Sequence, residues 1–205
     1  MVTAQPLVSV FADESCLGNG REGENPGGAG LLLEYAQNGT TLVRRDLWVA
    51  EPATTNNKMA LRSVIETFRA LSRKGTTFRV VFTTDSRYIV DGMTKWVHDW
   101  ARRGWRRKTG TIENLDLWRS AVELAAAHDV SWRWVRGHAG HAQNEYVNDL
   151  AVRAAETRSE SGGLIASGFD EWLTKRDRPL VPDVFPSSSE FRGSPRLPSS
   201  SRGSP

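Results

Sequence analysis

Two aspartates stand where acidic side chains could hold a metal ion. Asp13 follows the apolar run of residues 7–12, and Asp85 comes just after a second apolar run, residues 78–83. The carboxyl ends of strands in α/β sheets form the ligand crevice, so we expect both carboxylates there. Their mutual repulsion would be relieved by a cation, and Mg²⁺ combines one or two protein carboxylates with substrate phosphates. The pair predicts a Mg²⁺ site for phosphodiester chemistry, although either aspartate alone could simply cap a turn.

A basic, tryptophan-rich segment forms a second candidate site. Trp96 and Trp100 are one helical turn apart and share a face, and five of the seven residues from 102 to 108 are basic. Aromatic faces beside phosphate-neutralising charge suit a nucleic-acid backbone. The alternative is a solvated basic helix with its tryptophans in the core, which we expect for Trp105 and Trp118. The basic residues are Arg102, Arg103, Arg106, Arg107 and Lys108.

The elements that must position these residues alternate between strands and helices. Apolar runs predict strands at residues 7–12, 30–35, 40–48, 78–83 and 130–135. Helical spacing predicts helices at residues 59–71, 86–93, 115–128 and 144–156. The Thr and Asn residues at 54–57 suit a helix N-cap. This order is typical of a mixed α/β domain with one sheet and helices packed on it, over residues 1–157.

Composition limits the class of protein. With 39% hydrophobic and 25% charged residues, the 205-residue chain is typical of a soluble globular protein. No apolar stretch approaches the ~20 residues that span a bilayer, so no membrane partner is expected. Cys16 is the single cysteine, which fits a reducing compartment, and we expect a cytoplasmic protein. The net charge is only +3, so an anionic partner must be held by clustered charge.

Residues 158–205 differ in composition and are expected to form an extension. Gly and Ser first indicate a linker, and residues 168–175 could make a short amphipathic turn that docks on the domain. From Arg178 onward Pro, Ser, Gly and Arg dominate. Such a segment buries little apolar surface to offset its ordering entropy, so we expect a disordered tail.

Five motifs resemble those of bacterial type 1 ribonuclease H. They are DESCLGN at residues 13–19, TTNNKM at 54–59, TDS at 84–86, WVHDWARRGW at 96–105 and WVRGHAGH at 134–141. The resemblance covers about residues 7–157 and implies a ribonuclease H-like fold, a five-stranded mixed sheet flanked by helices on both faces. It also implies two-metal hydrolysis of the RNA strand of an RNA–DNA hybrid. The expected metal is Mg²⁺, with Mn²⁺ as a possible substitute. We expect a monomer with no small-molecule cofactor.

The chain departs from the family at two of four catalytic carboxylates. Asp13 and Asp85 match the first and third positions, whereas the second falls on Ala60 and the fourth on Asn148. Two metal ions lose much of their electrostatic support, so activity is expected to be low or abolished. Glu145, one helical turn before Asn148, is a possible ligand. Glu14 is given less weight, because alternation along a strand points it away from Asp13.

Two functions are therefore compatible with these residues: a hybrid-cleaving endoribonuclease, or a catalytically inactive hybrid-binding protein of the same fold. Natural divergence and deliberate substrate-trapping substitutions are both compatible with Ala60 and Asn148.

The resemblance assigns further roles. His138, in a Gly-flanked loop, would transfer protons beside the metal centre, whereas His141 would order that loop. The residues implied in nucleic-acid binding, besides the basic segment with Trp96 and Trp100, are Asn19, Thr55, Asn56 and Asn57. Arg87 stands where the family often has Gln, so we expect a phosphate contact there in place of a base-edge contact.

Overall fold

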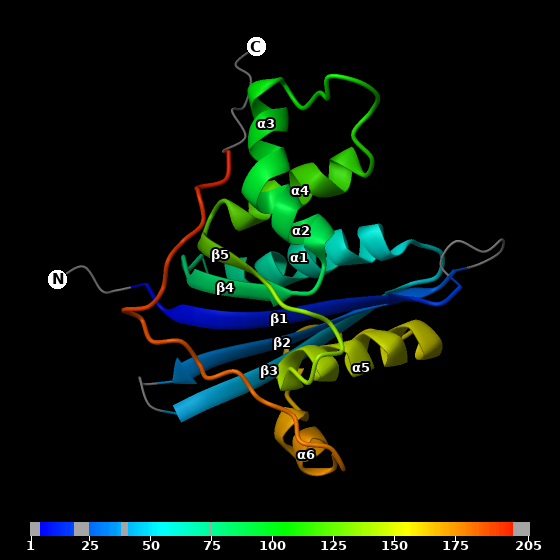
Figure 1. The fold of residues 1–205 in the computed structure, drawn as a ribbon, viewed down its shortest axis with the longest axis vertical. Helices are drawn as coiled ribbons and strands as arrows, with labels where there is room; N and C mark the ends of the chain where they lie inside the picture. The colour runs from blue at the N-terminus through cyan, green and yellow to red at the C-terminus, as the bar shows by residue number, and fades with distance from the viewer. Residues whose placement is uncertain (1–4, 19–24, 38–40, 74, 199–205) are drawn as a thin grey trace.

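The computed structural model describes residues 5–18, 25–37, 41–73 and 75–198, and its centre is a mixed sheet (Figure 1). The strands are β1 (Leu7–Cys16), β2 (Gly27–Gln37), β3 (Thr41–Glu51), β4 (Arg79–Thr84), β5 (Asp129–Trp134) and β6 (Ile165–Ala166). Their order is β5-β4-β1-β2-β3-β6. β1 pairs with β4, and β4 with β5, in parallel, while the β1–β2, β2–β3 and β3–β6 pairs are antiparallel. The expected α/β fold is confirmed, with the two-residue β6 added.

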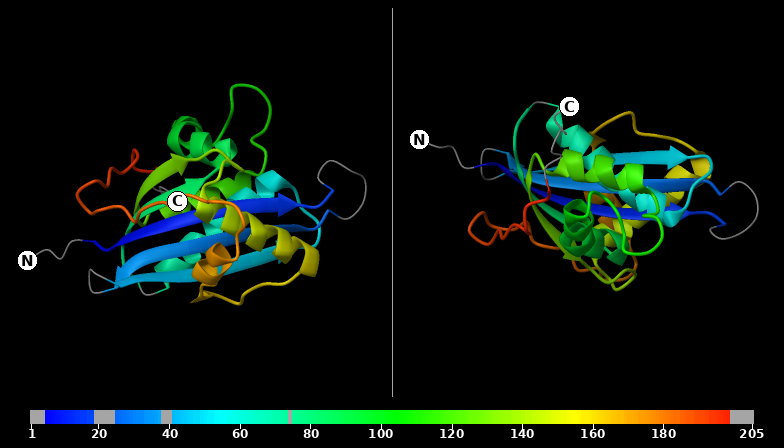
Figure 2. Two further views of the ribbon diagram at one scale, coloured as in Figure 1. Left: turned by 60° about the horizontal axis from the view of Figure 1, so that its bottom comes forward. Right: turned by 90° about the horizontal axis from the view of Figure 1, so that it is seen from above.

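Helices cover both faces of this sheet (Figure 2). On one face lie α1 (Asn56–Ser72) and α4 (Leu115–Ala125), next to α2 (Arg87–Asp91), the π-helical turn η1 (Gly92–Trp96) and α3 (Val97–Arg102). On the other lie α5 (Ala142–Thr157) and the short α6 (Phe169–Thr174). None of the helices in the described ranges is long and apolar enough to cross a membrane.

Strand alternation divides the core into two parts. In β1, Val8 and Val10 pack into the larger cluster with α1 and α4, whereas Phe11 packs into the smaller cluster with α5. In β2, Leu31 and Leu33 join the first cluster and Leu32 the second. Successive side chains of a strand point to opposite faces, so a fully apolar run is what a sheet covered on both sides requires.

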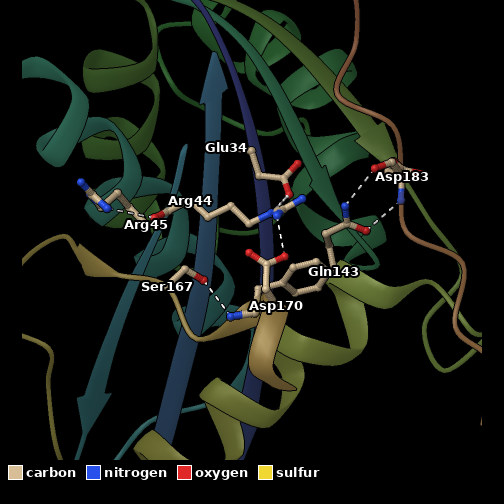
Figure 3. Close-up of polar contacts among 8 residues, drawn as sticks. Glu34, Arg44, Arg45, Gln143, Ser167, Asp170 and Asp183 are labelled. Atoms are coloured by element: carbon tan, nitrogen blue, oxygen red, sulfur yellow. Dashed lines mark hydrogen bonds and ion pairs between the residues drawn. The ribbon is translucent and has the colours of Figure 1, made fainter. Parts of the chain in front are cut away.

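The turn expected at residues 168–175 is present as α6, docked on the domain. Phe169 is buried, and the Arg44 guanidinium lies 5.0 Å from the centre of its ring. The same guanidinium pairs with the buried Glu34 and with Asp170, both at 2.7 Å (Figure 3). An ion pair shared between β2, β3 and α6 therefore fixes the helix to the sheet.

The segment from Arg178 to residue 198 differs from the disorder that its composition predicts. It runs back across the molecule toward β5 (Figure 1). Its backbone bonds to the loop before α5, Ser188 binds Arg79, and the Ser194 amide donates to the Val130 carbonyl at 2.8 Å. The prediction counted only apolar burial, whereas hydrogen bonds also hold this segment, beside the packing of Leu180 and Leu197 against the core clusters. The boundary at residue 157 stays a prediction.

Candidate active site

Asp13 and Asp85 lie side by side where parallel pairing ends. Ala12 is opposite Thr84, the last pair of the β1–β4 ladder, so the two aspartates are the next residue on each chain. Contrary to the expectation that the strand stops at Asp13, β1 continues to Cys16, because its other edge still pairs with β2. Asp13 is 5% exposed, and burial together with the neighbouring Asp85 raises its pKa to about 8.

Glu14 belongs to the same acidic group, which corrects the low weight given to it. Burial, followed by the charges of Asp13 and Asp85, raises the pKa of Glu14 well above its ordinary value. Its Oε2 atom is buried and has no hydrogen-bond partner. Glu14 points to the opposite face of the strand from Asp13. Because β4 ends at Thr84, the chain turns at Asp85 and Ser86 beside β1, and Ser86 hydrogen-bonds the Glu14 side chain. Three carboxyl groups therefore lie within electrostatic reach of one another where the β1–β4 ladder ends.

A glycine allows the loop of residues 137–141 to pass over this group. A Cβ atom on Gly137 would overlap the Asp85 carboxylate, so only glycine permits this approach. His138 follows with a left-handed backbone, φ 53°. Burial raises the pKa of Asp85, and the His138 ring opposes that shift, which places the ring within electrostatic reach of the carboxylate.

The first turn of α5 closes the group from the other face. His141 caps the helix, its Nδ1 atom accepting from the Asn144 amide at 3.2 Å. The buried Asn144 side chain donates to Asp13 Oδ2 at 3.4 Å. Asn144 lies outside the five family motifs. The sequence pattern that could have identified Asn144 is its position four residues before Asn148, which places both residues on one face of the helix. Asn148 itself is half-buried on α5.

Glu145 is close to the group but already bound. Its charge contributes to the raised pKa of Asp13. However, Oε1 accepts from the Gly140 amide at 3.3 Å, and Oε2 pairs with Arg178 at 2.5 Å. Asp149 points away from the group and accepts a hydrogen bond from Trp172 Nε1 on α6.

The family's second carboxylate position is part of the core. Ala60 is 1% exposed on α1 and packs in the larger core cluster, so it offers no ligand. Within the described ranges, no three or more His, Cys, Asp or Glu side chains are arranged as a ready-made metal site. The acidic group nevertheless fits a cation in its chemistry. Burial raises the pKa of all three carboxyl groups, neighbouring negative charges add to the shift at Asp13 and Glu14, and Glu14 has an unpartnered buried oxygen.

The tryptophan-rich segment begins at Trp96, the last residue of η1, and projects from the sheet as α3 and the loop after it (Figure 1). Trp96 and Trp100 do share a face, with ring centres 6.0 Å apart, and both pack against the fully buried Trp118. Trp96 remains 36% exposed. Trp105 also packs against the core and lies 5.6 Å from the Arg119 guanidinium. The five basic residues named above are all exposed.

The other nucleic-acid candidates occupy two places. Thr55 caps α1, accepting from the Lys58 amide, and Asn56 and Asn57 are exposed in the first turn. Arg87 is exposed and lies 3.9 Å above the ring of Trp134, whose Nε1 donates to the Asp85 carbonyl. Asn19 lies outside the described residues.

Comparisons with known proteins agree with this geometry. The sequence profile of the RNase H family matches residues 5–156. Ribonuclease H of Halorhodospira halophila is 45% identical over 152 residues, 74% of this chain and 94% of that protein. Ribonuclease H of Photorhabdus luminescens is 40% identical over 155 residues, 75% and 92% of the two chains.

Solved structures extend the comparison beyond the family profile. LC9-RNase H1, a type 1 RNase H with the type 2 active-site motif, is 65% identical, with a TM-score of 0.90 and 98% of each chain covered. The PFV RNase H domain is 17% identical, with a TM-score of 0.62 over 77% of this chain and 99% of that chain, and shows the fold alone.

Proposed function

Because this chain belongs to the ribonuclease H family, we propose that it hydrolyses the RNA strand of RNA–DNA hybrids with a divalent cation, Mg²⁺ or, as a substitute, Mn²⁺. The observation that carries the proposal is the convergence of Asp13, Glu14 and Asp85 at the end of the β1–β4 ladder. Glu14 would supply from β1 the carboxylate that position 60 lacks. A rearranged acidic set agrees with the variant active-site motif of the 65% identical LC9-RNase H1.

The acidic group would hold the cation, with Asn148 as a neutral oxygen donor. When bound, the cation would supply charge stabilisation and an activated water for phosphodiester hydrolysis. Asn144 would orient Asp13 through the amide bond to Oδ2. His138, whose ring lies within electrostatic reach of Asp85, would exchange protons with the reacting oxygens.

The protruding segment would hold the hybrid. Exposed guanidinium groups on residues 102–107 would neutralise phosphates, and the exposed part of Trp96 would contact sugar or base. At the start of α1, Thr55, Asn56 and Asn57 would present polar side chains at a helix N-terminus, where an anion is favoured. Arg87 would add a phosphate contact beside the active site.

A second function, hybrid binding without cleavage, has its own support. Ala60 and Asn148 remove two negative charges, and no ready-made metal cluster is arranged in the described part of the chain. This protein would grip the same substrate through the same surface and leave it intact.

Cleavage of a labelled RNA–DNA hybrid in Mg²⁺ or Mn²⁺ separates the two functions. We expect the chain to cleave, and Glu14→Gln to lower kcat by ~10²-fold or more, the scale associated with losing one preorganised electrostatic group. Glu156→Gln, an exposed change at the far end of α5, is the matched control and should cleave normally. Tight binding with no cleavage in either metal would establish the second function, and full activity of Glu14→Gln would remove Glu14 from the site.

A further inference from the structure

The C-terminal segment of residues 178–183, here called the clamp, pairs with the backbone of the loop before α5. The Val181 amide donates to the Gly140 carbonyl at 2.9 Å, and the Ala142 amide donates to the Val181 carbonyl at 3.1 Å. Together they form a parallel bridge between Val181 and His141. The Val181 side chain is 75% exposed, so the contact depends on its backbone rather than on apolar packing.

Asp183 binds the same turn through both backbone and side chain. Its amide donates to Gln143 Oε1 at 2.9 Å, and Gln143 Nε2 donates back to its carbonyl at 3.1 Å (Figure 3). Gln143 is fully buried, so this reciprocal pair satisfies an amide that would otherwise lack partners. The Asp183 carboxylate pairs with Arg133 on β5 and lies 3.2 Å from His141 Nε2.

Arg178 forms the third attachment. Its guanidinium pairs with Glu145 Oε2 at 2.5 Å, while Oε1 of the same carboxylate holds the Gly140 amide. Arg178 therefore neutralises a half-buried charge beside the acidic group and fixes the side chain that ties the loop of residues 137–141 to α5.

Through these contacts the clamp binds residues that in turn contact the acidic group or lie next to it. His141, held next to Asp183, caps the Asn144 amide, and the Asn144 side chain binds Asp13. We propose that the clamp positions the loop of residues 137–141 and the first turn of α5 for hydrolysis. It acts through His141, Gln143 and Glu145 and touches no reacting atom. This inference rests on the proposed function.

The sequence helps to explain how the clamp docks, in addition to the packing of Leu180 against the smaller core cluster. Pro179 and Pro182 flank Leu180 and Val181, and each proline fixes its own φ and disfavours helix at the residue before it. The unfolded segment therefore loses less conformational entropy when it pairs. The clamp also lies beyond the family match, which ends at residue 156, so it is an addition to the shared domain.

A matched pair of substitutions in the full chain tests the clamp. Val181→Pro removes the N–H that binds Gly140, whereas Val181→Ala keeps it and changes only an exposed side chain. We expect Val181→Pro to lower kcat on the hybrid by ~10-fold or more, since small displacements of catalytic groups are costly, with KM nearly unchanged. Amide hydrogen exchange at Ala142 and Asn144 should accelerate, with the melting temperature little changed.

Arg178→Ala should have the same kind of effect, and Arg178→Lys should restore part of kcat because it returns the charge beside Glu145. Ser188→Ala, which loses only the side-chain bond from Arg79 to Oγ, is the control for the rest of the tail and should behave as the parent. If Val181→Pro matches Val181→Ala in both kcat and exchange, the clamp is overturned. If the parent cleaves no hybrid, the proposed function fails, and exchange at Ala142 alone decides whether the clamp holds the turn.

Discussion

The side-chain amide of Asn144 donates to Asp13 Oδ2 at 3.4 Å, joining α5 to β1 inside the acidic group. This contact partly offsets the burial and repulsion that raise the pKa of Asp13 to about 8. A carboxyl group so far from its ordinary pKa of 3.8 carries a cost in stability as well as a role at the site.

Asp13→Asn should therefore stabilise the protein when no divalent cation is present. The Asp13 carboxyl group binds its proton more tightly in the folded state than in the unfolded state. Its contribution to the free energy of unfolding is therefore largest below pH 3.8 and is lost as pH rises to about 8. In chelator at pH 9 we expect the neutral amide to raise the melting temperature by at least ~3 °C, and by less at pH 5. Added Mg²⁺ should then raise the melting temperature of the parent but not of Asp13→Asn. An equal Mg²⁺ response in both would show that Asp13 holds no cation.

The exposed basic residues should set the salt dependence of hybrid binding. Replacing Arg102, Arg103, Arg106, Arg107 and Lys108 by Ala should weaken binding and flatten the slope of log affinity against log salt by up to ~4 units. Each lost phosphate contact releases one counterion fewer. Lys175→Ala, at the end of α6 on the opposite face, is the control and should leave the slope unchanged. An unaltered slope in the fivefold variant would place the hybrid elsewhere.

His128 should make stability fall on acidification. Its buried ring accepts from the Phe78 amide through Nδ1 at 3.2 Å, and burial lowers its pKa below 6.5. The neutral ring contributes fully to the free energy of unfolding above pH 6.5. This contribution is lost as the pH falls through the lowered pKa of His128 in the folded state. His128→Asn keeps an acceptor without titrating. Unfolding of both proteins between pH 7 and pH 5 should show a smaller loss in the variant; parallel curves would contradict a buried neutral imidazole.

Gly92→Ala should destabilise the protein although Gly92 has a helical backbone. Alanine normally favours a helix over glycine, but a Cβ atom here would overlap the six-membered ring of Trp118. We expect a loss of about 1–3 kcal/mol in the free energy of unfolding. Trp118→Phe removes the overlapping ring, so Gly92→Ala should cost less in that background. A double-mutant cycle by denaturant unfolding measures the difference, and strict additivity would contradict the overlap.

The features that could be predicted from the sequence are those that local patterns and strand pairing determine. Alternation and helical spacing located the principal strands and helices, and the parallel register of β1 and β4 makes Asp13 and Asp85 neighbours, as two aspartates after apolar runs implied. Glu14 was undervalued because its surroundings depend on where β4 ends. The role of Asn144 depends on how α5 packs across the sheet, which its sequence pattern does not determine. The order of residues 178–198 depends on partners that are distant in sequence, and composition gives no information about such partners.

The tail and β6 cover parts of the two edge strands of the sheet, where other protein molecules could pair. At one border, β6 pairs with Arg45 and Asp46 of β3; at the other, Ser194 binds Val130 and Trp132 of β5. Bare edge strands are templates for pairing with other chains. Segments that follow the ribonuclease H domain thus occupy donors and acceptors along both borders, and this occupancy should oppose intermolecular β-aggregation in concentrated solution.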